Sequence, residues 1–175
     1  ASLWEAPGPV APGAASGARP SASVAASPAS GARRIAMVNA HTGERIDIEY
    51  MRRGRYVEAA LAEFARFSRD WRENAVEPID PKVIDIAHAL WVRLGADAPL
   101  TLLSGYRTPK TNRRLPGAAR DSLHLQGRAL DLAHPKQPAG RLIAIAQSLG
   151  AGGVGAYSAS GFVHIDSGPM RVWGS

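Results

Sequence analysis

The chain has 175 residues, of which 45% are hydrophobic, and this is enough for one domain with a substantial core. It contains no cysteine, which excludes disulfides and closed thiolate metal sites, and no apolar run approaches the roughly 20 residues that a membrane span needs. The formal net charge of +6 favours anionic partners, among them nucleic acid, anionic lipid and the acidic polymers of a bacterial wall.

The first 33 residues differ in composition from the rest of the chain. They are mostly Ala, Gly, Pro and Ser, and their charged residues are Glu5, Arg19 and Arg33. Such a stretch buries too little apolar surface to offset its ordering entropy. We therefore predict a disordered tether over residues 1–33, of the kind that spaces an exported domain from a membrane or a signal peptide. The folded domain is expected over residues 34–175.

That domain opens with a predicted hairpin over residues 34–50. Two β-prone runs flank the turn Asn39-Ala-His-Thr-Gly43, and Ile46, Ile48 and Tyr50 alternate with polar neighbours.

Two amphipathic helices are predicted after the hairpin. The first extends from Tyr56 to about Arg72, with apolar residues at positions 57, 61, 64 and 71. The second begins at Asp80-Pro81, an N-cap followed by proline at the first helical position, and stops at Gly95.

The remaining elements are shorter. They are expected to be a strand over 100–104, a loop with or without a helical turn over 107–121, a strand over 128–133, a helix over 138–149, a glycine-rich loop over 152–155 and a strand over 162–166. Strands mixed with helices, without a repeated βαβ unit, predict a single α+β domain with a central, mostly antiparallel sheet and flanking helices.

The most informative motif is Ser122-Leu-His124-Leu-Gln-Gly127-Arg-Ala-Leu-Asp131, followed some thirty residues later by Phe162-Val-His164-Ile-Asp166. Two imidazoles and a carboxylate are the ligand set of a catalytic zinc that keeps one position for water. A turn at Gly127 can fold His124 back over the strand that carries Asp131. Each of these residues taken alone is more often structural, but the set with this spacing favours a metal site.

These motifs resemble the zinc peptidases of the D-Ala-D-Ala carboxypeptidase, VanX and Hedgehog amino-terminal fold, and most closely the murein endopeptidases of the YcbK (MepK) type. The similarity covers residues 34 to 173 or so. Its supporting segments are Asn39–Glu44, Gly54–Tyr56, Ile79–Lys82, Ser104–Asn112, Gly152–Tyr157, Phe162–Gly168 and Arg171–Trp173.

The resemblance implies His124, Asp131 and His164 as zinc ligands in a Hedgehog/DD-peptidase fold. It implies peptidoglycan (murein) peptide stems as the substrate, cleaved at bonds that join two diaminopimelate residues or D-Ala to diaminopimelate. The expected reaction is amide hydrolysis by a metal-activated water.

Further roles follow from the same resemblance. Arg107 matches a cleft arginine that polarises the scissile carbonyl or stabilises the developing oxyanion, although it can also form an ordinary surface ion pair. Ser122 matches a pocket hydroxyl that holds substrate, or it caps a turn. Tyr157 is expected to line the cleft or donate to substrate, or simply to pack.

One departure from the family pattern concerns the general base. Several branches place an acidic residue or histidine two or three residues before the last zinc ligand, but here these positions hold Gly161 and Phe162. Asp166 is the nearest substitute. It is either the base or a partner that fixes the tautomer of His164. His134 is a weaker candidate.

We therefore predict an exported or periplasmic zinc-dependent peptidoglycan peptidase, active as a monomer. The alternative is a catalytically inactive zinc-containing module that binds wall peptides or a protein partner. Nucleic-acid binding is disfavoured because no known binding motif appears. Basic residues at 107, 110, 113, 114 and 120 offer complementary charge for the carboxylates of peptide stems.

Overall fold

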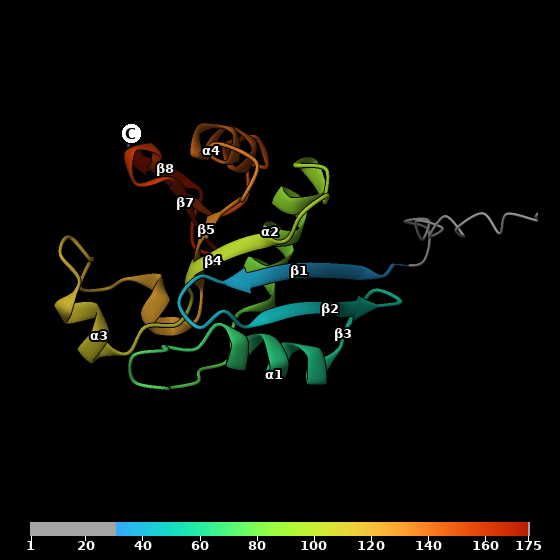
Figure 1. Ribbon diagram of the computed structural model, residues 1–175, viewed down its shortest axis with the longest axis horizontal. Coiled ribbons are helices and arrows are strands. Elements are labelled where there is room, and N and C mark those ends of the chain that lie inside the picture. The colour runs from blue at the N-terminus through green and yellow to red at the C-terminus, as the bar shows by residue number, and fades with distance from the viewer. Residues whose placement is uncertain (1–30, 175) are drawn as a thin grey trace, which may run out of the picture.

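The computed structural model describes residues 31–174, which form one eight-stranded sheet with helices packed against it (Figure 1). The strands are β1 (Arg33–Asn39), β2 (Arg45–Arg52), β3 (Arg55–Tyr56), β4 (Leu100–Ser104), β5 (Ala129–Ala133), β6 (Gly153–Tyr157), β7 (Phe162–Asp166) and β8 (Arg171–Gly174). The helices are α1 (Glu58–Phe67), α2 (Pro81–Arg93), α3 (Pro109–Arg114) and α4 (Ala139–Ser148), with two short 3₁₀ turns, η2 (Leu123–Gln126) and η3 (Ser158–Ser160).

The strand order is β3-β2-β1-β4-β5-β7-β6-β8. Of the seven neighbouring pairs in this sheet, five are antiparallel, while β1–β4 and β6–β8 are parallel. The predicted α+β class with a mostly antiparallel sheet is therefore confirmed. Of the predicted tether over residues 1–33, positions 1–30 lie outside the described residues, and Arg33 is the first residue of β1.

The helices contact different parts of the sheet. α2 packs against β1 and β7, α4 packs against β6 and β7, and these two helices touch each other, while α1 packs against β2. Figure 1 shows α1 beneath β2 and α4 beside β7, toward opposite ends of the sheet. The largest fully buried core side chains include Tyr50, Phe64, Ile84, Leu90, Leu130, Leu142 and Ile165. None of the helices within residues 31–174 is long and apolar enough to cross a membrane.

The predicted hairpin is formed by β1 and β2, and a buried asparagine organises its turn. The Asn39 side chain accepts from the backbone N–H groups of His41 and Thr42 at 2.9 and 3.1 Å, and its amide donates to the Phe67 carbonyl at 3.1 Å. Gly43 completes the turn at a φ of 72°, a conformation that favours glycine. The turn is thus fixed to the end of α1 as well as to its own strands.

The first helix is shorter than predicted, because α1 ends at Phe67 and not near Arg72. The Ser68 hydroxyl donates to the Phe64 carbonyl at 2.7 Å, and the Asp70 carboxylate accepts from the backbone N–H of Arg72 at 3.1 Å. Short polar side chains that bond the local backbone compete with helix continuation in this way. Trp71 therefore lies on a loop, although its spacing fits the apolar stripe of the helix.

The second helix follows its prediction closely. The Asp80 side chain accepts from the Lys82 N–H at 3.0 Å, Pro81 occupies the first helical position, and Gly95 follows the end of the helix at a φ of 100°. The basic segment over 107–121 contains the expected helical turn as α3, which the Thr108 side chain caps by accepting from the Thr111 N–H at 3.1 Å.

The glycine-rich segment after residue 152 is a strand and not the predicted loop. β6 pairs with β7 on one side and with β8 on the other. A Cβ at Gly153 would lie 2.4 Å from the Arg171 guanidinium and 2.5 Å from Asp166, and one at Gly155 would lie 2.9 Å from Trp173. The glycines are therefore needed for close approach of side chains across the sheet, which is a different use from turn formation.

Candidate metal centre

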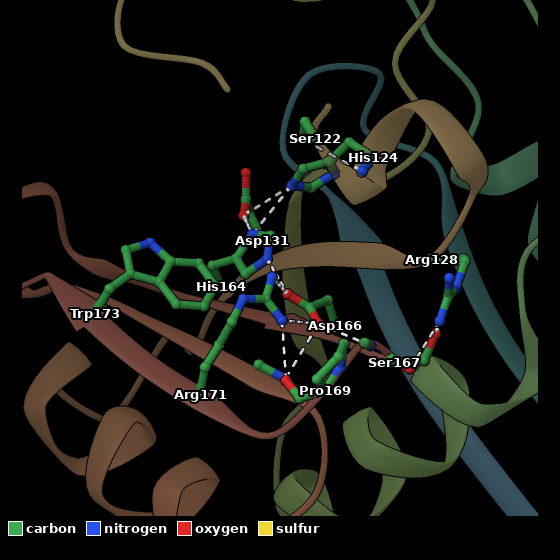
Figure 2. Close-up of polar contacts among 12 residues, drawn as sticks. Ser122, His124, Arg128, Asp131, His164, Asp166, Ser167, Pro169, Arg171 and Trp173 are labelled. Atoms are coloured by element: carbon green, nitrogen blue, oxygen red, sulfur yellow. Dashed lines mark hydrogen bonds and ion pairs between the residues drawn. The ribbon is translucent and has the colours of Figure 1, made fainter. Parts of the chain in front are cut away.

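The three predicted ligands come together from three separate elements. Asp131 lies on β5 directly opposite His164 on the antiparallel strand β7, and η2 brings His124 over the same strands (Figure 2). Gly127 ends η2 at a φ of 62°, and a Cβ there would lie 2.2 Å from the Pro78 carbonyl oxygen. The chain reversal expected at Gly127 is thus present, and a side chain at this position would prevent it.

The ligand atoms lie at distances that suit one metal ion. His124 Nε2 is 3.2 Å from Asp131 Oδ1 and 3.2 Å from His164 Nδ1, and His164 Nδ1 is 2.9 Å from Asp131 Oδ1. Donor atoms of a tetrahedral zinc site, each about 2.0–2.2 Å from the ion, are separated by about 3.3–3.5 Å. The three ligand side chains would therefore need to move apart only slightly to hold a small divalent cation.

Neighbouring groups fix which ring nitrogens point at this centre. His124 Nδ1 lies 2.6 Å from the Gly105 carbonyl, which can only accept, so this nitrogen carries the proton. His164 Nε2 lies 3.0 Å from an oxygen of Asp166 and donates to it in the same way. Consequently His124 Nε2 and His164 Nδ1 present lone pairs toward the Asp131 carboxylate. Three converging electron-pair donors repel one another unless a cation lies between them.

The electrostatics of the three side chains favour positive charge at the centre, either on His164 or on a bound cation. Burial lowers the pKa of His124. Burial also acts to lower the pKa of His164, but its contacts with Asp131 and Asp166 outweigh burial and raise it. Burial acts to raise the pKa of Asp131, yet its contacts with both histidines hold that pKa well below the usual range. The centre thus keeps its carboxylate ionised and attracts positive charge.

Arg107 is placed beside the ligand carboxylate. Its guanidinium donates to Asp131 Oδ2, the oxygen that does not face the histidines, and its Nε donates to the Ser104 hydroxyl at 2.8 Å. The side chain is 14% exposed and also lines the cleft described below. Arg107 can therefore orient Asp131 and present positive charge to a bound molecule.

Asp166 lies on the far side of the His164 ring from the other two ligands (Figure 2). It is fully buried and accepts from His164, from the backbone N–H groups of Gly153 and Gly168 at 3.1 and 2.9 Å, and from two nitrogens of Arg171 at 3.0 and 2.8 Å. Burial acts to raise its pKa, but its contacts with His164 and Arg171 outweigh burial and lower it. This environment favours the alternative in which Asp166 fixes the tautomer of His164.

An open cleft of about 690 Å³ lies over the three ligands. One wall is the rim segment, defined here as residues 115–122, all of which except Arg120 line the cleft. The other wall is formed by Tyr157, Phe162, Arg171 and Trp173. The Trp173 ring lies 5.1 Å from the His164 ring, and the Arg171 guanidinium lies 4.7 Å from the Trp173 ring. A cleft of this volume can hold a small molecule or a short peptide segment.

Ser122 and Tyr157 both line this cleft. The Ser122 hydroxyl also caps η2, because it accepts from the His124 N–H at 3.4 Å. Tyr157 stacks on Phe162 with ring centroids 4.6 Å apart, and its hydroxyl accepts from Trp173 Nε1 at 3.2 Å. Each side chain thus combines the expected cleft position with the structural role that was considered as its alternative.

Several cleft residues were not assigned from the sequence. Arg171 and Trp173 alternate along β8 and share the face toward the cleft, and Asp121 lies on the rim segment. Arg171 and Trp173 could have been found from the sequence, because residues two positions apart on a strand face the same side of the sheet. His134 is not part of the centre: its Nδ1 accepts from the Lys136 N–H at 3.1 Å, and its nearest carboxylate is Asp97.

Comparison with known proteins agrees with the geometry. Residues 27–173 match the family of the peptidoglycan L,D-endopeptidase MepK. The chain is 39% identical over 145 residues to the peptidoglycan L,D-endopeptidase MepK of Escherichia coli (strain K12), covering 81% of this chain and 80% of that protein. It is 34% identical over 146 residues to the probable peptidoglycan L,D-endopeptidase MepK of Haemophilus influenzae, covering 81% of this chain and 78% of that one.

Proposed function

The chain belongs to the peptidoglycan L,D-endopeptidase MepK family, and we propose that it cleaves murein cross-links in which the L-centre carbonyl of one diaminopimelate is joined to the D-centre amine of another. It is a metallopeptidase of the cell envelope that hydrolyses peptidoglycan. The observation that carries the assignment is the convergence of His124, Asp131 and His164, whose ligand atoms all lie within 4.8 Å of one another at the floor of the cleft.

We propose Zn²⁺ as the metal, held by His124, Asp131 and His164. Two imidazoles and one carboxylate suit zinc better than the all-oxygen sites preferred by Mg²⁺ or Ca²⁺. When bound, zinc supplies a Lewis acid and lowers the pKa of a water ligand into the neutral range. All three side chains line the cleft, so a scissile bond could reach an ion held there.

Arg107 is proposed to act on the substrate carbonyl. Its guanidinium is already fixed by Asp131 and Ser104, so little reorganisation is needed when negative charge develops on the carbonyl oxygen. Asp166 is proposed as a positioning residue that holds the Nε2 proton of His164, and Arg171 in turn holds Asp166.

Ser122 and Tyr157 are proposed to contact the substrate from the two walls of the cleft. The Tyr157 hydroxyl accepts from Trp173, so its own proton is free to donate to a peptide carbonyl. Residues 34–175 are proposed as the catalytic domain, which acts as a monomer in the periplasm without binding nucleic acid. The tether over residues 1–33 remains a prediction.

A direct test combines metal removal with a defined substrate. The purified protein is dialysed against a chelator, reloaded with Zn²⁺ and incubated with cross-linked muropeptide dimers, and the products are identified by mass spectrometry. We expect hydrolysis of the diaminopimelate–diaminopimelate bond that is lost on dialysis and restored by one equivalent of zinc. Cleavage that continues without metal would refute the mechanism. Binding of dimers without any turnover would indicate the alternative wall-peptide binding module.

A further inference from the structure

The cleft carries charged groups of both signs around the metal centre. Apart from the three ligands, its ionic lining residues are Arg107, Arg171 and Asp121. Arg107 and Arg171 already bind carboxylates of the protein, Asp131 and Asp166 respectively. Asp121 is therefore the one carboxylate in the described lining of the cleft that is not a metal ligand.

Asp121 is available to a ligand. The residue is exposed, and within residues 31–174 no hydrogen bond or ion pair engages its side chain. Glu58, Glu63 and Glu77 are also exposed and have no such contact among the described residues, but they lie outside the cleft, whereas Asp121 lines it. A bound cationic group would give Asp121 the partner that the protein itself does not supply.

The position of Asp121 is tied to the metal centre by the chain. It directly precedes Ser122, the residue that caps η2, and η2 carries the ligand His124. On its other side, the Ala119 carbonyl accepts from the Asn112 amide at 2.8 Å and from the Ser122 N–H at 3.3 Å. The carboxylate is thus presented at a defined place on the rim segment, across the cleft from the wall that carries Arg171.

The substrate of an L,D-endopeptidase offers a matching group. In a diaminopimelate–diaminopimelate cross-link, the donor residue supplies the L-centre carbonyl of the scissile bond, and its other end carries a free ammonium group and a free carboxylate on a flexible methylene arm. A D-alanine donor has only a methyl group there. The ammonium group and the carboxylate are therefore the charged groups that distinguish a diaminopimelate donor, and the ammonium group is the one that an acidic side chain can bind.

We propose that Asp121 binds the free ammonium group of the donor diaminopimelate and so makes the cleft select this donor. This inference rests on the proposed function. The scissile amide lies over the ligands at the floor, and the donor arm extends toward the rim segment. Charge complementarity of this kind gives specificity because a donor without the ammonium group leaves Asp121 without a partner.

The test compares a change in the protein with a change in the substrate, made separately and together, as in a double-mutant cycle. In a cross-linked dimer that retains N-acetylmuramic acid, the donor ammonium is the only free amine, so it can be acetylated selectively. We expect acetylation to lower kcat/KM of the wild-type protein about tenfold, mainly through KM, because one charge-assisted contact is lost. Asp121→Asn and Asp121→Ala should lower kcat/KM for the unmodified dimer by the same factor and should no longer respond to acetylation.

Asp47→Asn is the matched control, because it also removes one exposed carboxylate but lies in the β1–β2 hairpin, where it pairs with Arg34. It should respond to acetylation like the wild type. The proposal is overturned if the Asp121 variants still discriminate between the two dimers. It is also overturned if they lose kcat equally on both, since this would indicate proton transfer or a structural role. Failure of the wild-type protein to cleave either dimer would refute the proposed function itself.

Discussion

The floor and the rim of the cleft are built differently. At the floor, His124, Asp131 and His164 are buried, and each has a further partner that fixes its orientation: Gly105, Arg107 and Asp166, respectively. The rim segment is mostly exposed and is held by a few contacts, of which the Asn112–Ala119 hydrogen bond is the clearest. This contrast indicates that the floor determines the reaction, whereas the rim determines which substrate is accepted.

The largest expected effect follows from removing a floor ligand. His164→Ala leaves the other two donors without a third, so we expect loss of the bound metal and a fall in hydrolysis of at least about a thousandfold. Metal content by elemental mass spectrometry and cleavage of muropeptide dimers measure the two effects together. His41→Ala is the matched control, because His41 is exposed and bonds the Leu103 carbonyl outside the centre. A His164→Ala protein that keeps both metal and activity would exclude this centre.

A smaller loss is expected from Arg107→Ala. The variant removes the positive charge beside the substrate carbonyl, so kcat should fall by about a hundredfold or more while KM changes little. Arg107→Lys should recover only part of this, because an ammonium group cannot bond Asp131 and Ser104 with the same planar fork. Metal content serves as the control. If the loss of activity follows loss of metal, Arg107 acts through Asp131 alone.

Asp166→Asn distinguishes the two roles considered for this residue. As a positioning residue, Asp166 should affect metal affinity by about 10- to 100-fold, which competition with a chromogenic chelator measures. Activity should then return toward the wild-type value at saturating zinc, because the ligands themselves are intact. If Asp166 were instead the general base, activity would stay low at every zinc concentration while metal affinity changed little.

The ligands at the floor could be predicted from the sequence because their placement follows from patterns within short segments of the chain. Strand alternation places His164 and Asp166 on one face of β7, and the glycine after the His124 turn indicates a chain reversal. The choice between base and positioning residue for Asp166 depended on Arg171 and Gly153, which come from β8 and β6. Neither strand was predicted. Glycines read as loop formers were in fact needed to let side chains approach across the sheet.

The end of α1 and the role of the rim segment could also not be predicted from the sequence pattern. Helical spacing predicted that Trp71 belongs to α1, but Ser68 and Asp70 bond the local backbone and end the helix. The carboxylate of Asp121 has no sequence pattern that marks it as a cleft residue. Its significance depends on its place in the cleft lining, where it is the one carboxylate that is not a metal ligand, and only the packed structure shows this.

The smallest expected effect tests the rim. Asn112→Ala removes the hydrogen bond to the Ala119 carbonyl, so the rim segment should become less ordered and KM should rise about threefold with kcat and metal content unchanged. The free energy of unfolding should fall by about 1 kcal/mol. Asn39→Ala is the matched control, because Asn39 is equally buried, at 4% exposure, but fixes the β1–β2 turn. It should lose at least as much stability, by denaturant titration, with no change in KM. Equal effects of both variants on KM would show that the rim responds to overall stability, and the division of roles between floor and rim would then be wrong.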